Sequence, residues 1–192
     1  MGFQSSLKLM TAAIDQAMGD ANWKGLALIV GTGGIGEAIT TALARQCPGL
    51  TVITAGRQGG SLQQLQLDLE SDADLARLAS DLQQFEQPLR LVFNCSGRLH
   101  GPGLIPEKRL SQVSRAALAE QFAINAFAPV LLAKAVEPLL ERNRPFHFAS
   151  LSARVGSIGD NRSGGWYSYR AAKSAQNQLL KTLSIEWNRR WP

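Results

Sequence analysis

Cysteine and histidine are scarce in this sequence of 192 residues. The two cysteines, Cys47 and Cys95, are too few for a disulfide scaffold or a cysteine-rich zinc site. The histidines are His100 and His147, and with only these two we expect no resident metal centre. The chain is therefore expected to act without a disulfide framework and without a metal.

Clustered charge and long apolar runs are also missing. The 20 Lys and Arg residues outnumber the 15 Asp and Glu residues, but they are scattered, and the densest cluster is Arg189-Arg190. We therefore expect no nucleic-acid partner, whereas a phosphate-bearing cofactor would use the mild positive potential equally well. No apolar run reaches the roughly 18 residues that span a membrane, and the start does not resemble a signal peptide. We expect a cytoplasmic protein with no membrane contact.

The composition, with 45% hydrophobic residues, is that of a globular domain. Residues 1–24 form an N-terminal extension, in which Leu7, Met10, Ile14, Ala17 and Met18 fall at helical spacing. This pattern predicts an amphipathic helix, although a frayed terminus explains it equally well. Residues 25–192 contain no linker or internal repeat and are predicted to be one domain.

Apolar, β-branched segments alternate with helical patterns through this domain. The predicted strands are residues 26–30, 50–55, 62–69, 89–93 and 146–150, and the predicted helices are residues 37–46, 73–85, 115–142 and 166–190. Strands that alternate with helices indicate a mostly parallel sheet covered on both faces, that is, a three-layer α/β/α fold.

A glycine-rich turn follows the first predicted strand and opens the first predicted helix. The turn Gly31-Thr32-Gly33-Gly34-Ile35-Gly36 contains the G-x-G-x-x-G pattern of dinucleotide-binding sites. Its glycines permit the tight turn, the approach of a pyrophosphate and the packing of helix on strand. The helix N-terminus then offers free N–H groups to the phosphates. The alternative is a plain strand-to-helix turn without a ligand.

The end of the second strand indicates which dinucleotide is bound. An NAD site places a carboxylate there, but this chain has Ala55-Gly56-Arg57 and no acid nearby. Arg57 is suited to a 2′-phosphate, so we expect NADP(H) to be preferred over NAD(H). The alternative is that Arg57 is merely a solvated loop cation.

Tyr169 and Lys173 are spaced i, i+4 and share one face of the last predicted helix. An ammonium beside a phenol favours the phenolate and lowers the tyrosine pKa. Tyr169 is therefore a candidate general acid/base that exchanges a proton with a carbonyl or alcohol oxygen.

Together these motifs resemble the short-chain dehydrogenase/reductase family from about Gly25 to the last residue. Within the family, the segments 154–158 and 164–170 look most like the C-factor and sniffer-like carbonyl reductases. The resemblance implies a Rossmann-type doubly wound parallel sheet with strand order 3-2-1-4-5. It implies a catalytic set of Asn125, Ser152, Tyr169 and Lys173, with the last two also touching the cofactor. The further cofactor contacts that it implies are Asp68, Leu69, Asn94, Cys95, Ser96 and Gly97.

The chain departs from the family in three places. Its glycine turn is one residue shorter, and the family's catalytic serine falls at Ala153 when counted back from Gly156, one position after Ser152. The chain also stops before the last two strands and the substrate loop of the family, so we expect a C-terminally truncated sheet with an exposed edge.

Two functions are compatible with these observations. The first is an NAD(P)(H)-dependent oxidoreductase that interconverts a small-molecule carbonyl and alcohol. The alternative is a nucleotide-binding regulatory or signalling protein with little or no turnover, and a truncated product with neither activity is a third case. The apolar faces of the long helix and the last helix correspond to a family interface, so we expect a homodimer or homotetramer.

Overall fold

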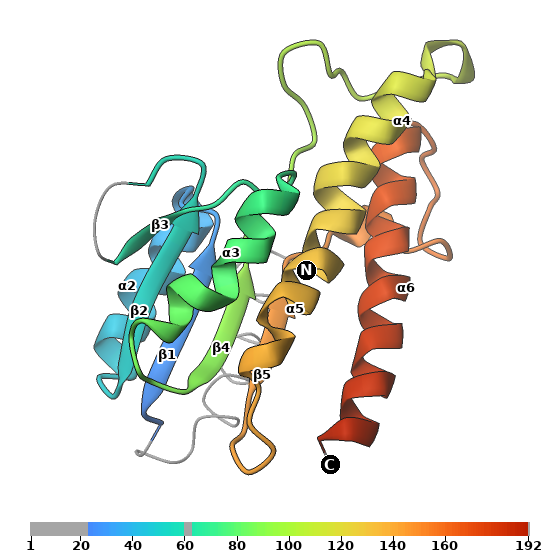
Figure 1. Ribbon diagram of the computed structural model, residues 1–192. Helices are drawn as coiled ribbons and strands as arrows, with labels where there is room; N and C mark the ends of the chain where they lie inside the picture. The colour runs from blue at the N-terminus through green and yellow to red at the C-terminus, as the bar shows by residue number, and fades with distance from the viewer. Residues whose placement is uncertain (1–22, 60–62, 192) are drawn as a thin grey trace.

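The computed structural model describes residues 23–59 and 63–191, so most of the predicted N-terminal extension lies outside the described residues. Strands and helices alternate along the chain (Figure 1). The strands are β1 Gly25–Val30, β2 Leu50–Gly56, β3 Gln64–Gln66, β4 Leu89–Asn94 and β5 His147–Ser150. The helices are α2 Gly34–Gln46, α3 Asp72–Gln83, α4 Arg115–Phe122, α5 Ala128–Val136 and α6 Tyr167–Arg190. Shorter helical segments are η1 Leu110–Gln112, η2 Ala123–Phe127, η3 Glu137–Leu139 and η4 Arg154–Gly156.

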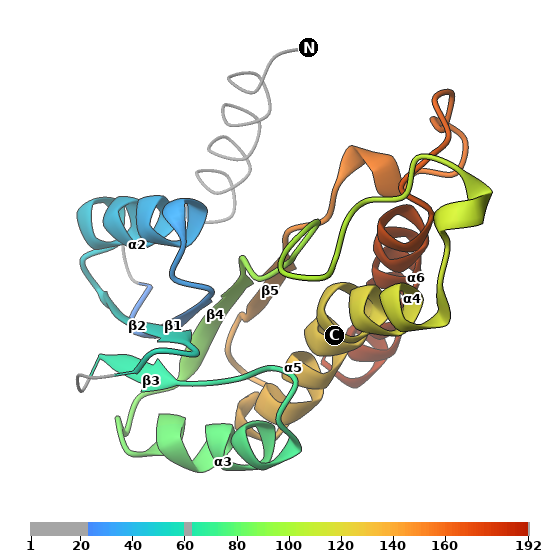
Figure 2. The same cartoon turned by 90° about the horizontal axis from the view of Figure 1, so that it is seen from above.

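The five strands form one parallel sheet in the order β3-β2-β1-β4-β5, which confirms the predicted Rossmann-type topology. Strand β1 is central and buried along its whole length. Because side chains alternate across a strand, Leu26 and Leu28 join one apolar cluster, whereas Ala27 and Ile29 join the other. Helix α2 covers the second cluster, and α3 and α5 cover the first (Figure 2).

The helical region predicted over residues 115–142 extends from Arg115 to Leu139, and the structure divides it into α4, the π-helical η2, α5 and η3. Pro129 has no N–H, so an α-helical bond to the carbonyl of Asn125 cannot form. The Ala128 N–H instead donates to the carbonyl of Ala123, five residues back, as in a π-helix. Helix α5 ends at Val136, two residues before Pro138.

The third strand is also shorter than predicted. In the described part of the predicted range 62–69, the strand that pairs with β2 is Gln64–Gln66, and Asp68 and Leu69 follow it as a loop. At the opposite edge, β5 has no further strand beside it in residues 23–59 and 63–191. This observation agrees with the expected exposed edge.

One helical stretch, Arg115–Leu139, is long and apolar enough to cross a membrane by length and composition alone. Its most apolar window has a mean hydropathy of 1.5. Leu132 and Val136 of this stretch are fully buried in the cluster beneath the sheet. In this fold the stretch therefore forms one layer of the domain.

Candidate functional site

A cleft of about 460 Å³ lies at the carboxyl ends of the strands. In an open parallel sheet this edge is where ligands bind, at the point where the strand order reverses. The reversal here lies between β1 and β4. The cleft is lined by Val30, Gly31, Thr32, Gly33, Gly56, Arg57, Leu67, Asp68, Leu69, Glu70, Cys95, Ser96, Gly97, Arg98 and Ile124.

The glycine turn has the geometry of a phosphate cradle. Gly31 has a φ of 94°, which favours glycine, and a Cβ on Gly36 would lie 1.9 Å from the Gly31 carbonyl oxygen. By contrast, a Cβ on Gly33 or Gly34 would meet nothing within 4 Å. Gly33 therefore has open space beside it at the start of α2. The first backbone N–H groups of a helix have no acceptor within the helix, and no side chain caps them here. A turn of this geometry has room for an anion such as a phosphate at the helix N-terminus.

One end of the cleft is formed after β2 and β3 and carries the residues predicted to contact the adenosine part of a cofactor, so we call it the adenosine end. Arg57 is exposed there, and a Cβ on Gly56 would lie 3.3 Å from the hydroxyl of Thr32. Asp68 is held in place because its N–H donates to Asp74 at 2.8 Å and its carboxylate accepts the N–H of Glu70 at 3.0 Å. Glu70 also lines the cleft and was not among the predicted residues. The sequence feature that could have indicated Glu70 is its position two residues after Asp68.

The loop after β4 forms the wall opposite the glycine turn. Cys95, Ser96 and Gly97, which were predicted to contact the cofactor, line the cleft, whereas Asn94 is fully buried. Asn94 accepts the N–H of Ser96 at 3.0 Å and its hydroxyl at 2.6 Å, so it shapes the loop from within. Burial raises the pKa of the Cys95 thiol to about 11, which keeps it protonated at neutral pH.

Asn125 lies in the π-helical η2 and is fully buried. Its amide oxygen accepts the N–H of Arg98 at 3.1 Å, and its amide nitrogen donates to the Arg98 carbonyl at 2.8 Å and to Gln121 at 2.6 Å. A Cβ on Gly97 would lie 3.2 Å from the Asn125 Oδ1 and 3.3 Å from the Lys173 Nζ. The fold therefore brings Asn125 and Lys173 together at the Gly97 end of the cleft.

Helix α6 presents Tyr169 and Lys173 at this same end. The turn before the helix is shaped by Gly164 and Gly165, both at positive φ, and by Trp166 at φ 52°. The Trp166 N–H donates to the carbonyl of the buried Glu107, which fixes where α6 begins. The Lys173 ammonium lies 5.9 Å from the centroid of the Tyr169 ring and donates to the Leu151 carbonyl at 3.0 Å.

The pKa values at this pair differ from the sequence-based expectation. Burial lowers the pKa of Lys173 to about 8, because the charged ammonium loses solvation. Burial also raises the pKa of Tyr169 above its ordinary value. The expected lowering of the tyrosine pKa by the ammonium is therefore wrong for the protein alone, since Nζ donates its hydrogen bonds elsewhere and desolvation dominates.

Ser152 follows β5 and is exposed. Its hydroxyl donates to the amide oxygen of Asn177 on α6 at 2.6 Å. Ala153, the position expected for the serine when counted back from Gly156, precedes η4 and offers no hydroxyl. The Ser152 hydroxyl thus lies next to α6 and already has an acceptor there.

Two buried amides complete this region and were missed in the sequence. Gln121 donates to the Leu99 carbonyl at 2.9 Å while accepting from Asn125, and Gln176 accepts from Lys173 at 2.9 Å. Both are only 1% exposed. The available signal was spacing, because Gln121 precedes Asn125 by four residues and Gln176 follows Lys173 by three.

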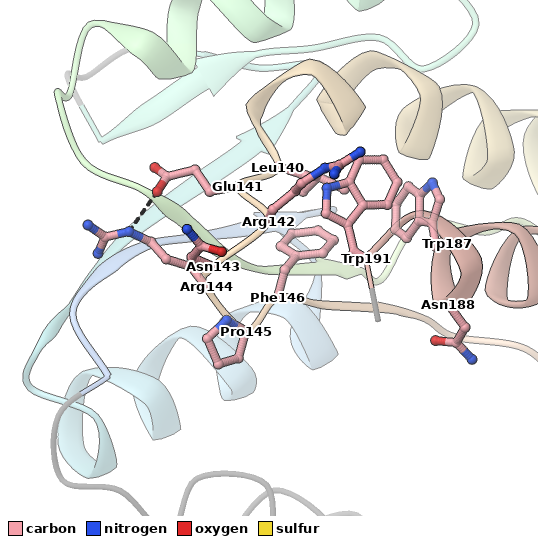
Figure 3. A pocket seen from close by; sticks show the side chains of 10 residues that line it. All are labelled: Leu140, Glu141, Arg142, Asn143, Arg144, Pro145, Phe146, Trp187, Asn188 and Trp191. Atoms are coloured by element: carbon pink, nitrogen blue, oxygen red, sulfur yellow. Dashed lines mark hydrogen bonds and ion pairs between the residues drawn. The ribbon is translucent and has the colours of Figure 1, made fainter.

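A larger cavity, of about 500 Å³, lies away from these residues (Figure 3). It is enclosed by the segment 140–146 and by Trp187 and Trp191 near the end of α6. Arg144 and Glu141 pair with each other at its rim at 2.6 Å. None of the predicted site residues lines this cavity, so we place the candidate site in the smaller cleft.

Comparison with known proteins shows which proteins the chain resembles. The family model described as enoyl-(acyl carrier protein) reductase matches residues 30–191. The 1-hydroxy-2-glutathionyl-2-methyl-3-butene dehydrogenase of Rhodococcus sp. (strain AD45) is 33% identical over 113 residues, covering 59% of this chain and 46% of the relative. The C-signal of Myxococcus xanthus is 34% identical over 77 residues, covering 40% of this chain and 46% of the relative.

Among solved structures, the carbonyl reductase Sniffer of D. melanogaster has a TM-score of 0.76 at 25% identity. The match covers 88% of this chain and 77% of that chain. The chain spans about half the length of the curated relatives that it matches.

Proposed function

The chain belongs to the short-chain dehydrogenase/reductase family, and from this we propose that it is an NAD(P)(H)-dependent oxidoreductase that interconverts a carbonyl and an alcohol. One observation carries the proposal. Asn125 and Lys173 lie close together beside Gly97, at one end of a cleft that the glycine turn also lines. Tyr169 lies on the same face of α6, next to Lys173. One end thus suits phosphates, and the other holds groups that move or position a proton.

The proposed roles follow from the chemistry of each side chain. A bound nicotinamide cofactor supplies or accepts the hydride. Tyr169 holds or takes the proton of the substrate oxygen through its phenol group, and the raised pKa keeps that phenol protonated before substrate arrives. The Lys173 ammonium stabilises the phenolate that forms when the proton leaves. Ser152 donates to the substrate oxygen when its hydroxyl turns from Asn177, and Asn125 holds the loop beneath the site.

The proposal is tested by binding and turnover together. We expect NADPH to quench or enhance the tryptophan fluorescence on binding, and its absorbance to fall when apolar and polar aldehydes and ketones are supplied. Calorimetry with NADPH on the same sample separates loss of binding from loss of chemistry. A protein that binds NADPH but oxidises it with no member of the carbonyl panel contradicts the oxidoreductase proposal.

We also propose that NADP(H) is preferred over NAD(H), because Arg57 is exposed at the adenosine end of the cleft. Replacing Arg57 by Ala is expected to weaken NADPH binding about 10- to 100-fold, as a charge-assisted hydrogen bond to phosphate is lost, and to leave NADH binding unchanged. Titration calorimetry with both nucleotides measures the difference. Arg45→Ala, an exposed arginine in the last turn of α2, is the matched control. Equal losses for NADPH and NADH in Arg57→Ala exclude a role in choosing the cofactor.

A second candidate function is nucleotide-dependent regulation with little or no turnover. The bond from Ser152 to Asn177 favours it, because this hydroxyl is already occupied. The name of one relative, C-signal, designates a signal. Under this alternative NADPH binds as tightly, but the carbonyl panel gives no oxidation.

We further propose that the protein works in the cytoplasm on a small-molecule substrate and assembles as a homodimer or homotetramer. Exposed apolar side chains on the helical side of the domain support the assembly, namely Phe127 in η2, and Tyr167 and Ile185 on α6. Sedimentation equilibrium is expected to give a multiple of the 20.7 kDa chain mass. A mass equal to that of one chain excludes stable assembly.

A further inference from the structure

Gln176 is a polar side chain at a position of α6 that faces the core. It is 1% exposed and lies three residues after Lys173 and seven after Tyr169, so the three share one face of the helix. Burying an amide costs free energy unless its oxygen and nitrogen are hydrogen-bonded. The partners of this amide therefore indicate why a polar residue is present here.

Both ends of the amide are engaged. The oxygen accepts from the Lys173 Nζ at 2.9 Å, and the nitrogen donates to the hydroxyl of Ser150 at 2.9 Å and to the Leu151 carbonyl at 3.1 Å. The ammonium of Lys173 donates to the same Leu151 carbonyl at 3.0 Å. Lys173 and Gln176 thus both donate to the Leu151 carbonyl after β5, and they are also hydrogen-bonded to each other. These bonds restrict the movement of the ammonium.

The contacts continue from Ser150 to the wall of the cleft. The Asn94 amide nitrogen donates to the Ser150 hydroxyl at 3.0 Å, and the Asn94 oxygen accepts from Ser96. Ser96 itself lines the cleft. Gln176 is therefore the link between the Lys173 ammonium and a hydrogen-bonded chain that reaches the cleft through β5 and β4.

We propose that Gln176 is a positioning residue that holds the ammonium of Lys173 in place, and in its charged form, at the Gly97 end of the cleft. The role of this ammonium in stabilising the Tyr169 phenolate rests on the proposed function. The hydrogen bonds of Gln176 do not depend on that function.

The surroundings of Lys173 explain why such a residue is needed. Lys173 is 3% exposed, and burial lowers the pKa of its ammonium to about 8, so the group loses its proton readily above that pH. Arg98 is paired with Glu120 at 2.7 Å, and Arg154 with Asp160 at 2.5 Å. Titratable or charged groups near Lys173 on α6 are Tyr169 and Arg170, and those on the elements packed against α6 are Arg115 and Glu120 of α4, Lys134 of α5 and Arg154 of η4. Cys95 and Arg98 lie in the loop after β4. An amide oxygen that accepts from the protonated nitrogen favours the charged form without adding a charge.

The test is a titration of Lys173 itself. Lysine labelled with ¹³C at Cε is followed by NMR from neutral to alkaline pH, and the Lys173→Met spectrum assigns the signal. In Gln176→Met, which keeps the length of the side chain but removes the acceptor, the pKa of Lys173 is expected to fall by about one to two units. In Gln176→Glu it is expected to rise above the wild-type value, because a carboxylate favours the ammonium more strongly.

A structural role alone would not move the two variants in opposite directions. Gln178→Met, an exposed glutamine on the same helix, is the matched control and is expected to leave Lys173 unchanged. If a Gln176 variant does not fold, Ser150→Ala replaces it, since it loosens Gln176 and should lower the Lys173 pKa by a smaller amount. Equal pKa values of Lys173 in wild type and variants, or a fall in both, overturn the proposal.

Turnover provides the second readout. The alkaline limb of the pH profile for kcat/KM is expected to move with the Lys173 pKa, down in Gln176→Met and up in Gln176→Glu. A profile that stays in place while the lysine titration moves shows that Gln176 does not act in the reaction, which overturns its positioning role. Absence of turnover in wild type overturns the proposed function instead, and the NMR titration still decides whether Gln176 holds the ammonium.

Discussion

Replacing Tyr169 by Phe is expected to lower the rate of NADPH oxidation by about 10²- to 10⁴-fold, the usual contribution of a positioned general acid. The change removes the hydroxyl and keeps the aromatic ring, which contacts Trp166 and lies beside the Lys173 ammonium. The affinity for NADPH should stay within a few-fold of wild type, because the Gly31 turn and the adenosine end of the cleft are untouched. Steady-state kinetics and calorimetry on the same preparations measure both quantities.

Tyr167 provides the matched control for this experiment. It is the other tyrosine of the chain, it begins α6, and its side chain is 42% exposed. Tyr167→Phe should leave both the rate and the NADPH affinity unchanged. A wild-type rate of turnover in Tyr169→Phe would contradict the role of Tyr169 as general acid. Equal losses of rate in both variants would show that the substitutions disturb the folding of α6, and that the phenol of Tyr169 has no special role.

The pKa values of Tyr169 and Lys173 predict how the rate of carbonyl reduction depends on pH. Burial raises the pKa of the phenol, so Tyr169 stays protonated through neutral pH, whereas the Lys173 ammonium begins to lose its proton near its pKa of about 8. Reduction of a carbonyl, which needs a proton donor beside a cation, should therefore decline as the pH rises through about 8. The same measurement in Tyr169→Phe should show little of this dependence.

Replacing Gly36 by Ala is expected to have the second large effect, on stability and on cofactor binding together. The new Cβ would lie 1.9 Å from the carbonyl oxygen of Gly31, a backbone atom that cannot turn aside as a side chain can. Helix α2 must then move off β1, at a cost of about 1–3 kcal/mol, typical of overpacking. The same movement withdraws the helix N-terminus from the phosphates, so NADPH affinity should fall as well. Urea unfolding and calorimetry measure the two losses.

Gly34 tests whether the effect depends on position or on losing any glycine of the turn. A Cβ there would meet nothing within 4 Å, and Gly34 is the first residue of α2. Gly34→Ala should leave stability unchanged or raise it by up to about 1 kcal/mol, since alanine favours helix. If Gly36→Ala unfolds at the same urea concentration as wild type, the close packing of α2 on the turn is not the reason for glycine at this position.

Local patterns in the sequence were sufficient for much of the scaffold. The apolar run 26–30 and the β-branched run 50–55 correctly predicted β1 and β2, because short strands depend on neighbouring residues. The glycine turn indicated where α2 follows, but the helix begins at Gly34, three residues before the predicted start at Glu37. The i, i+4 spacing likewise placed Tyr169 and Lys173 on one helix face. The parallel topology followed from the alternation of strands and helices.

The π-helical turn at Asn125 was not predicted, although its cause is in the sequence. Pro129 signals a disturbed helix four residues earlier, but it does not say whether the helix kinks, ends or widens. The choice of a π-helix depends on how η2 packs between α4, α5 and α6. Only the folded chain brings those helices together.

By itself, then, the sequence determined the alternation of strands and helices, the glycine turn and the shared helix face of Tyr169 and Lys173, because each depends on residues close together in the chain. The parallel sheet that this alternation predicted forms only on folding, when distant strands such as β1 and β4 pair. The tertiary structure alone decided that Lys173 is held by Gln176, that Ser152 is bonded to Asn177, and that burial raises the pKa of Tyr169. These properties depend on desolvation and on partners brought together by folding. Desolvation and long-range hydrogen bonds leave no repeating pattern in the sequence. They arise only when α6 packs against the segment at the end of β5.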